Sequence, residues 1–195
     1  MNPADIIEIY TEMTPNPESL KFVTNRHILP NFQLDFRTKE TADGSELAKT
    51  LFNIPFVNGV FISNEFVTIT KKHEYDWFEI TPELKEAVKN FLKSGKQPVD
   101  DALLPKDILQ EQNPAAAIND PESKIKELLD KYVKPAIQGD GGHIEFKSFE
   151  QGVVTVSLQG ACSGCPSSTM TLKSGIEGLL KRMVPEVEEV VAESE

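Results

Sequence analysis

The residues of this sequence best suited to chemistry are its only two cysteines, Cys162 and Cys165. The two residues between them give a spacing at which both sulfurs can reach one metal ion. Thiolates are soft ligands, and they select iron–sulfur clusters, zinc or copper(I) over hard cations. We therefore predict a metal site with Cys162 and Cys165 as ligands.

The surroundings of this pair favour ionised sulfurs. A predicted strand ends before Cys162 and a predicted helix begins after Cys165, so both sulfurs would lie at the positive end of a helix dipole. Gly160 and Gly164 permit a tight backbone, and Pro166 suits the start of a helix because it has no N–H to satisfy. We expect both cysteines to lie in a loop outside the hairpin and helix cores, with the thiolate form favoured.

The number of ligands predicts an assembly of two chains. Cubane iron–sulfur clusters and structural zinc sites usually take four protein ligands, but each chain offers only two cysteines. A homodimer with the two loops facing across a two-fold axis would complete the set. A cluster that is shared between subunits and close to solvent is easily released, which suits a carrier better than an electron-transfer protein.

Two other functions are compatible with the same pair. In a thiol–disulfide oxidoreductase, one cysteine attacks a substrate disulfide and the other resolves the mixed disulfide. Against a thioredoxin-like site, no aromatic residue directly precedes Cys162, and Pro166 follows the motif instead of separating the sulfurs. The other possibility is a zinc-bridged dimer with a purely structural role.

Composition and charge argue against several classes of function. The 195 residues carry a net charge of −11, with a pI near 4.8, so no basic surplus exists to bind nucleic acid or anionic membranes. No apolar run is long enough to span a bilayer, and acidic residues occur near the start, where a signal or transit peptide would be basic. We find no catalytic acid–base pair and no nucleotide-binding loop in the sequence. We therefore expect a cytoplasmic protein that is not an enzyme and that binds neither nucleic acid nor membrane.

The chain length predicts two small domains, of the α+β class. The polar, proline-containing stretch 96–119 is the expected linker, which places the first domain at 1–95 and the second at 120–195. In the first domain, Thr81 and Pro82 are the expected start of a helix. The other elements expected there are strands over 6–11, 19–23, 57–62 and 66–70 and a short helix around 47–52.

The second domain is expected to follow the order α-β-β-α-β. Its first helix begins near Pro121 and ends at Pro135. Alternating apolar and polar residues on both sides of Gln151 and Gly152 predict a β-hairpin. A helix over 167–183 and a strand over 187–192 complete the order. The cysteines therefore lie between the hairpin and the second helix.

Several motifs resemble those of the Nfu (NifU-like) family. The stretch from about Glu122 to Ala192 is similar to the family's C-terminal NifU-like domain, and most of the remainder is similar to its N-terminal domain. The C-terminal likeness rests on Gly139-Asp140-Gly141-Gly142, Leu158 to Ser168, Thr171-Leu172-Lys173, Ile176 and Pro185-Glu186-Val187. The N-terminal likeness rests on Thr14 to Phe22, Leu51-Phe52, Val67 to Lys71 and Trp77.

This resemblance implies a scaffold or carrier that binds a 4Fe–4S cluster between two CxxC motifs and passes it to apo-enzymes. Cys162 and Cys165 match the ligands of that family. The resemblance also implies a homodimer on cluster loading, an upstream cluster donor and apo iron–sulfur client proteins as partners. A 2Fe–2S form with the same four thiolates is chemically possible.

One departure from the family pattern is His143. It follows the paired glycines, where many members have a small or acidic residue. A histidine at the start of a strand is more often a turn or surface residue than a ligand, and four cysteines already complete the predicted site. We therefore do not expect His143 to bind the metal.

Overall fold

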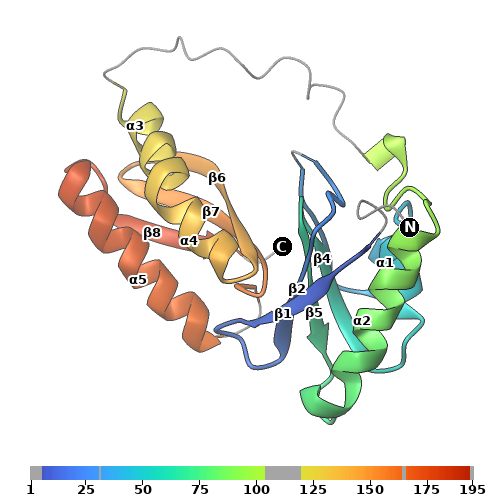
Figure 1. Ribbon diagram of the computed structural model, residues 1–195. Coiled ribbons are helices and arrows are strands. Elements are labelled where there is room, and N and C mark those ends of the chain that lie inside the picture. Colours follow the sequence, from blue (N-terminus) through green and yellow to red (C-terminus); the bar gives the residue numbers. More distant parts are fainter. Residues whose placement is uncertain (1–5, 31, 104–119, 164–165, 194–195) are drawn as a thin grey trace. The chain divides into compact units, whose positions relative to one another are not determined.

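The computed structural model of the chain describes residues 6–30, 32–103, 120–163 and 166–193. It contains two compact units, Met1–Lys106 and Asp107–Glu195. In Figure 1 the first unit is coloured from blue to green and the second from yellow to red. Most of the expected linker, from residue 104 to 119, lies outside the described residues. The proposed domain limits at 95 and 120 therefore stay a prediction.

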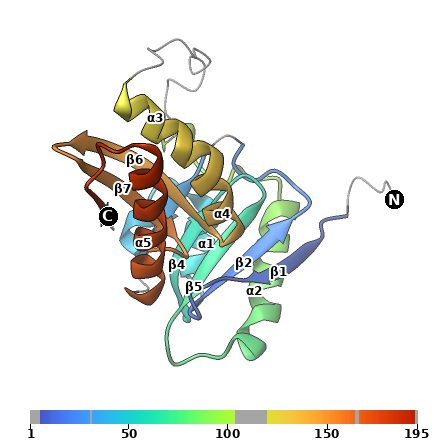
Figure 2. The same cartoon turned by 90° about the vertical axis from the view of Figure 1, so that its left-hand side faces the viewer.

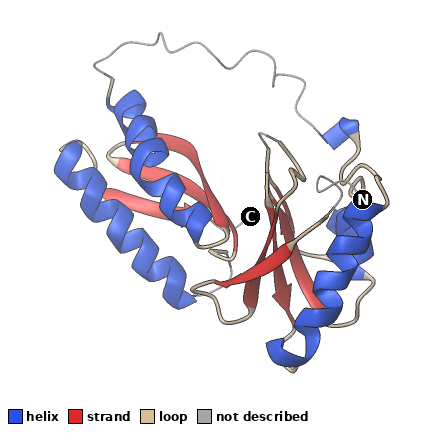
Figure 3. Cartoon of the chain, in the orientation of Figure 1, coloured by secondary structure: helices blue, strands red, loops and turns tan. Residues whose placement is uncertain are grey.

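The first unit is built on an antiparallel sheet of five strands with the spatial order β1-β2-β5-β4-β3. The strands are β1 (Ile9–Met13), β2 (Ser19–Thr24), β3 (Leu34–Phe36), β4 (Val57–Ile62) and β5 (Phe66–Lys71). The helices α1 (Glu46–Phe52) and α2 (Trp77–Lys93) pack on one face of this sheet (Figure 3). Two short 3-10 turns are η2 (Lys39–Ala42) and η3 (Asp101–Leu103).

The core of the first unit lies between the sheet and the two helices. Successive side chains of a strand point to opposite faces, so each strand contributes alternate residues to this layer. Phe22 of β2 and Ile69 of β5 are completely buried there, together with Leu51 of α1 and Leu84 of α2. The arrangement confirms the α+β class expected from the sequence.

Helix α2 begins earlier than the sequence analysis predicted. Its first residue is Trp77, and the Asp76 side chain caps it by accepting a hydrogen bond from the Phe78 N–H at 2.8 Å. Pro82 therefore lies inside the helix, where its missing N–H cannot serve the carbonyl four residues earlier. The Thr81 hydroxyl donates to the Trp77 carbonyl at 2.5 Å. The prediction of a start at Thr81 was wrong because Asp76 supplies the stronger N-terminal cap.

The second unit has the predicted order α-β-β-α-β. Its sheet has the order β6-β7-β8, with β6 and β7 antiparallel and β7 and β8 parallel. The helices α3, α4 and α5 cover one face of this sheet (Figure 2). The elements are α3 (Pro121–Leu128), a π-helical turn η4 (Leu129–Val133), α4 (Lys134–Gly139), β6 (Gly142–Glu150), β7 (Val153–Gly160), α5 (Pro166–Met183) and β8 (Glu189–Glu193).

The first helix of this unit does not end at Pro135. The helical path continues to Gly139, because a π-helical turn over Leu129–Val133 precedes the proline. In a π-helical turn each N–H bonds to the carbonyl five residues earlier instead of four. This local change in hydrogen bonding lets the helix continue through Pro135. The extra turn brings Ile137, which is 1% exposed, into the core of the unit. It also carries the chain to the start of β6.

Within the described residues, no helix is both long enough and apolar enough to cross a membrane.

Ser45 is expected to be the most sensitive capping residue of the first unit. Its buried hydroxyl accepts from the Ala48 N–H at 3.1 Å and donates to the Pro98 carbonyl at 2.8 Å. Ser45→Ala should lower the free energy of unfolding by about 1–2 kcal/mol in urea titrations, because both bonds are lost in a buried site. Thr50→Ala is the control. The Thr50 hydroxyl is exposed and bonds only within α1, so a similar loss there would contradict this prediction.

Candidate metal centre

The backbone around Cys162 forms a tight turn at the end of β7. Gly160, with φ of 68°, adopts the left-handed conformation that favours glycine. Its carbonyl accepts from the Ser163 N–H at 3.1 Å and from the Ser163 hydroxyl at 2.8 Å. The Ala161 N–H donates to the Gly141 carbonyl at 3.2 Å. The turn is thereby joined to the segment that leads into β6.

The CxxC motif therefore lies between a strand and a helix, as the sequence predicted. Strand β7 ends at Gly160, and α5 begins at Pro166, directly after the second cysteine. Cys165 and Gly164 lie outside the described residues. Among the described residues, no group of three or more histidine, cysteine, aspartate or glutamate side chains is placed to hold a metal ion.

Cys162 does not lie in an exposed loop. Its side chain is 1% exposed and belongs to the hydrophobic core of the second unit, together with Ile144, Leu158 and Ile176. Burial, with the nearby Asp140 carboxylate as a second cause, raises the pKa of the Cys162 thiol from 9.0 to about 12. The expectation of a favoured thiolate is therefore wrong for Cys162 in this conformation. Loss of solvation outweighs any gain from a helix dipole.

The position of the Cys162 sulfur depends on a glycine in the facing strand. Gly142 pairs with Gly160 in the β6–β7 register. A Cβ atom placed on Gly142 would lie 2.8 Å from the Cys162 Sγ and 2.7 Å from the Gln159 carbonyl oxygen. Both distances are too short, so only glycine leaves room for the sulfur here. The sequence analysis did not find this role. Counting outward from the turn at Gln151 and Gly152 would pair Gly142 with Ala161, and only the β-bulge between Phe146 and Ser148 brings Gly142 opposite Gly160.

His143 lies on the opposite face of β6 from the cysteine. A Cβ atom on Gly142 would point toward the Cys162 sulfur. Because side chains alternate along a strand, the His143 side chain points to the other face. His143 is half-buried rather than an exposed turn residue, and within the described part of the chain its buried Nδ1 has no hydrogen-bond partner. Burial, followed by the positive charge of Lys134, lowers the pKa of His143. The expectation of a surface residue was wrong.

Two family profiles match this chain. The profile of the NifU-like domain matches residues 125–191, and the profile of the N-terminal domain of the Nfu/NifU scaffold protein matches residues 9–95. The chain therefore belongs to the Nfu family of iron–sulfur cluster scaffold proteins.

Relatives of known name agree with this assignment. The human "NFU1 iron-sulfur cluster scaffold homolog, mitochondrial" is 39% identical over 97% of this chain and 73% of the human protein. The Arabidopsis thaliana "NifU-like protein 4, mitochondrial" is 43% identical over 95% of this chain and 65% of that protein. The chain thus spans slightly less than two thirds of the Arabidopsis relative. The solution structure of a NifU-like protein from Saccharomyces cerevisiae is 26% identical, with a TM-score of 0.44, and covers 51% of this chain and 89% of that chain.

The names of these relatives contradict the cytoplasmic location expected from the sequence. Both the human and the Arabidopsis proteins are named mitochondrial, which points to the mitochondrion. The expectation rested on the acidic residues near the start of the sequence, and the absence of a basic start does not decide the compartment.

Gly142→Ala is expected to displace the Cys162 sulfur. The added methyl group has to move either the sulfur or the Gln159 carbonyl, so we expect a loss of about 1–3 kcal/mol in the free energy of unfolding. Gly139→Ala is the matched control, since no atom lies within 4 Å of the Cβ position there. Urea titration of both variants gives the comparison. Equal stability of the two would show that the Gly142 contact does not constrain the sulfur.

The raised pKa of Cys162 predicts slow alkylation of the empty protein. A Cys165→Ser variant leaves Cys162 as the sole thiol. At pH 8 its reaction with iodoacetamide should be on the order of 100-fold slower in the native than in the urea-unfolded chain, because the native thiol is buried and protonated. Mass spectrometry gives both rates. The native rate should keep rising as the pH passes 9.0 toward about 12, while the unfolded rate levels off above 9.0. Equal rates would contradict the buried thiol.

Proposed function

We propose that two copies of this chain bind one 4Fe–4S cluster as cargo, with Cys162 and Cys165 of each copy as its four ligands. The observation that carries the proposal is that the only two cysteines stand together between β7 and α5, in a chain whose relatives are named iron–sulfur cluster scaffolds. A cubane cluster takes four thiolates, so one chain cannot complete the set with cysteine. A 2Fe–2S cluster uses the same number of thiolates.

The buried state of Cys162 supports a carrier rather than a permanent holder. A thiolate is the form that binds iron, so Cys162 must lose its proton and its sulfur must leave the core before it ligates. Both steps are unfavourable while the pKa lies near 12. The free energy of these steps is subtracted from the affinity for the cluster. The empty chain, with a protonated and buried thiol, is correspondingly favoured after release.

Transfer then consists of ligand exchange. Thiolates of an apo iron–sulfur protein replace the sulfurs of Cys162 and Cys165 on the iron atoms, and each departing sulfur leaves with its electron pair and takes a proton. No oxidation or reduction is needed. An upstream protein supplies the cluster by the same exchange in reverse. On this proposal the chain is a scaffold and not an enzyme.

A thiol–disulfide oxidoreductase is less compatible with this site. The attacking sulfur of such an enzyme needs a substantial thiolate fraction near neutral pH and access to a substrate disulfide. Cys162 has neither in this conformation, because it is 1% exposed and its pKa is raised to about 12. The raised pKa therefore disfavours the alternative in which Cys162 is the attacking thiol.

Reconstitution with iron and sulfide tests the shared site. Under anaerobic conditions the loaded protein should contain about four iron and four sulfide ions per dimer, and sedimentation should show a monomer that dimerises on loading. A loaded monomer with a stoichiometric cubane cluster would contradict the shared site.

Because Cys162 is buried, the side chain that replaces it must be compatible with an apolar core. Cys162→Ser places a hydroxyl group among apolar side chains, at a cost of about 1–3 kcal/mol. Cys162→Ala avoids the buried hydroxyl group. We expect Cys162→Ala and Cys165→Ala to lose cluster binding while circular dichroism stays that of a folded chain. A variant that is folded and fully loaded would remove that cysteine from the ligand set.

A further inference from the structure

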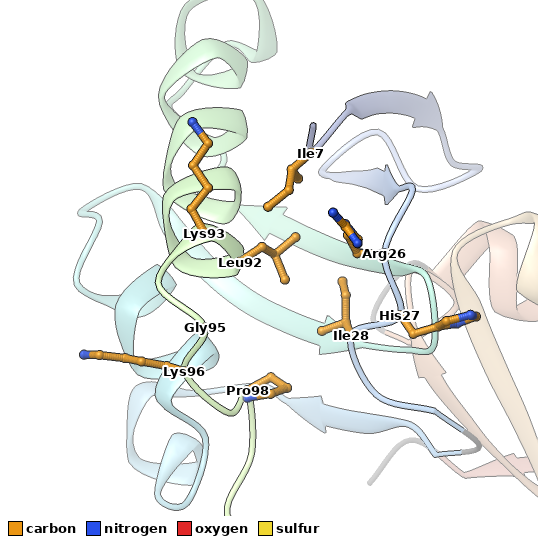
Figure 4. A pocket seen from close by; sticks show the side chains of 9 residues that line it. All are labelled: Ile7, Arg26, His27, Ile28, Leu92, Lys93, Gly95, Lys96 and Pro98. Carbon is orange, nitrogen blue, oxygen red and sulfur yellow. The ribbon is translucent and has the colours of Figure 1, made fainter. Parts of the chain in front are cut away.

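A hollow of about 460 Å³ lies in the first unit, beside the C-terminal end of α2. Figure 4 shows that the side chains of Ile7, Ile28, Leu92 and Pro98 surround it. These residues come from the segment before β1, the loop after β2, the end of α2 and the segment that follows α2. The volume is within the range of binding pockets, roughly 300–1,000 Å³. An apolar side chain of another molecule therefore fits inside.

The rim of this hollow is positively charged in a chain of net charge −11. Arg26, Lys93 and Lys96 line it, and none of the described lining residues is an aspartate or glutamate. One carboxylate lies close by, since Glu65 is 3.4 Å from the ring of the lining residue His27. Figure 4 shows the Arg26 side chain beside the apolar residues, while Lys93 and Lys96 extend outward from the rim. None of the three side chains forms an ion pair with another described residue.

The helix dipole accounts for only part of this charge. Lys93 lies in the last turn of α2, where a cation stabilises the negative end of the dipole. Arg26 belongs to the loop after β2, a different segment, so the dipole of α2 does not explain its presence. Arg26, Lys93 and Lys96 come from the loop after β2, the end of α2 and the segment that follows α2, and together they form a positive field that attracts negative charge.

We propose that this hollow is a docking site for an acidic peptide segment of another protein, with one aliphatic or aromatic side chain inserted between Ile28 and Leu92. The cations are spread around the rim instead of converging on one point, which matches several carboxylates along an extended chain better than one compact anion. Charges at the rim set the rate and specificity of association, and the buried apolar side chain supplies affinity. The hollow belongs to the first unit and the cysteines belong to the second, so this proposal does not depend on the proposed cluster binding.

Fluorescence anisotropy with the full-length protein tests this site. The probe is a fluorescein-labelled peptide of sequence DELDEF at low ionic strength. Arg26→Glu combined with Lys96→Glu should weaken binding by about tenfold or more, because two cations that attract the peptide carboxylates are replaced by anions that repel them. Lys39→Glu combined with Lys72→Glu is the matched control, since it changes the net charge equally at two exposed lysines outside the hollow. The control should change binding by less than about twofold.

Two further probes separate the contribution of the apolar side chain to peptide binding from that of the negative charges. The peptide DEADEA should bind at least about fivefold more weakly than DELDEF, because it lacks the apolar side chain. Inorganic phosphate at matched ionic strength should not displace DELDEF. The proposal is overturned if the native protein does not bind DELDEF, if both pairs of substitutions weaken binding equally, or if DEADEA binds as well as DELDEF. Displacement by phosphate would also overturn it, since the hollow would then be a site for a compact anion. Thermal melting of each variant confirms that it is folded.

Discussion

The close packing of the Cys162 sulfur against Gly142 is the contact on which the candidate metal centre depends. Gly142 begins β6 and faces Gly160, which ends β7, so the hairpin closes over the sulfur at its open end. A side chain on Gly142 would push the sulfur out of the core. The same closure requires the left-handed turn at Gly160 and the hydrogen bond between Ala161 and Gly141. The chemistry of the thiol therefore follows from the geometry of a hairpin.

This geometry separates the site from redox CxxC motifs. A redox pair needs an exposed sulfur with a depressed pKa, whereas Cys162 is buried and its pKa is raised. A core position stabilises the protonated, empty form of the chain. In the proposed role as a cluster carrier, a stable empty form is an advantage, because each increment of stability in that form lowers the affinity for the cluster.

The first unit contributes a different kind of surface. Its sheet and helices form a core without cysteine, and its basic hollow contrasts with the negative charge of the whole chain. Repulsion between acidic proteins weakens their association, and a local cluster of basic residues reduces that repulsion where an acidic partner binds. If the hollow binds an acidic peptide as proposed, a partner can be recognised by residues that take no part in holding the cluster. On these two proposals, recognition and cluster binding belong to different units of the chain.

The sequence by itself determined the order of the elements of the second unit, the hairpin, the place of the CxxC motif between a strand and a helix, and membership of the Nfu family, but it did not predict the short strand β3 of the first unit. These features depend on local signals, namely apolar periodicity, turn residues and short motifs. It did not determine the burial of Cys162, because that depends on Gly142 in the facing strand and on the core of the second unit, which includes Ile176 of α5. It also missed the π-helical turn before Pro135 and the gathering of Arg26 and Lys96 at one hollow. Only the tertiary structure decided these points, since burial and charge proximity arise from contacts between residues that are distant along the chain.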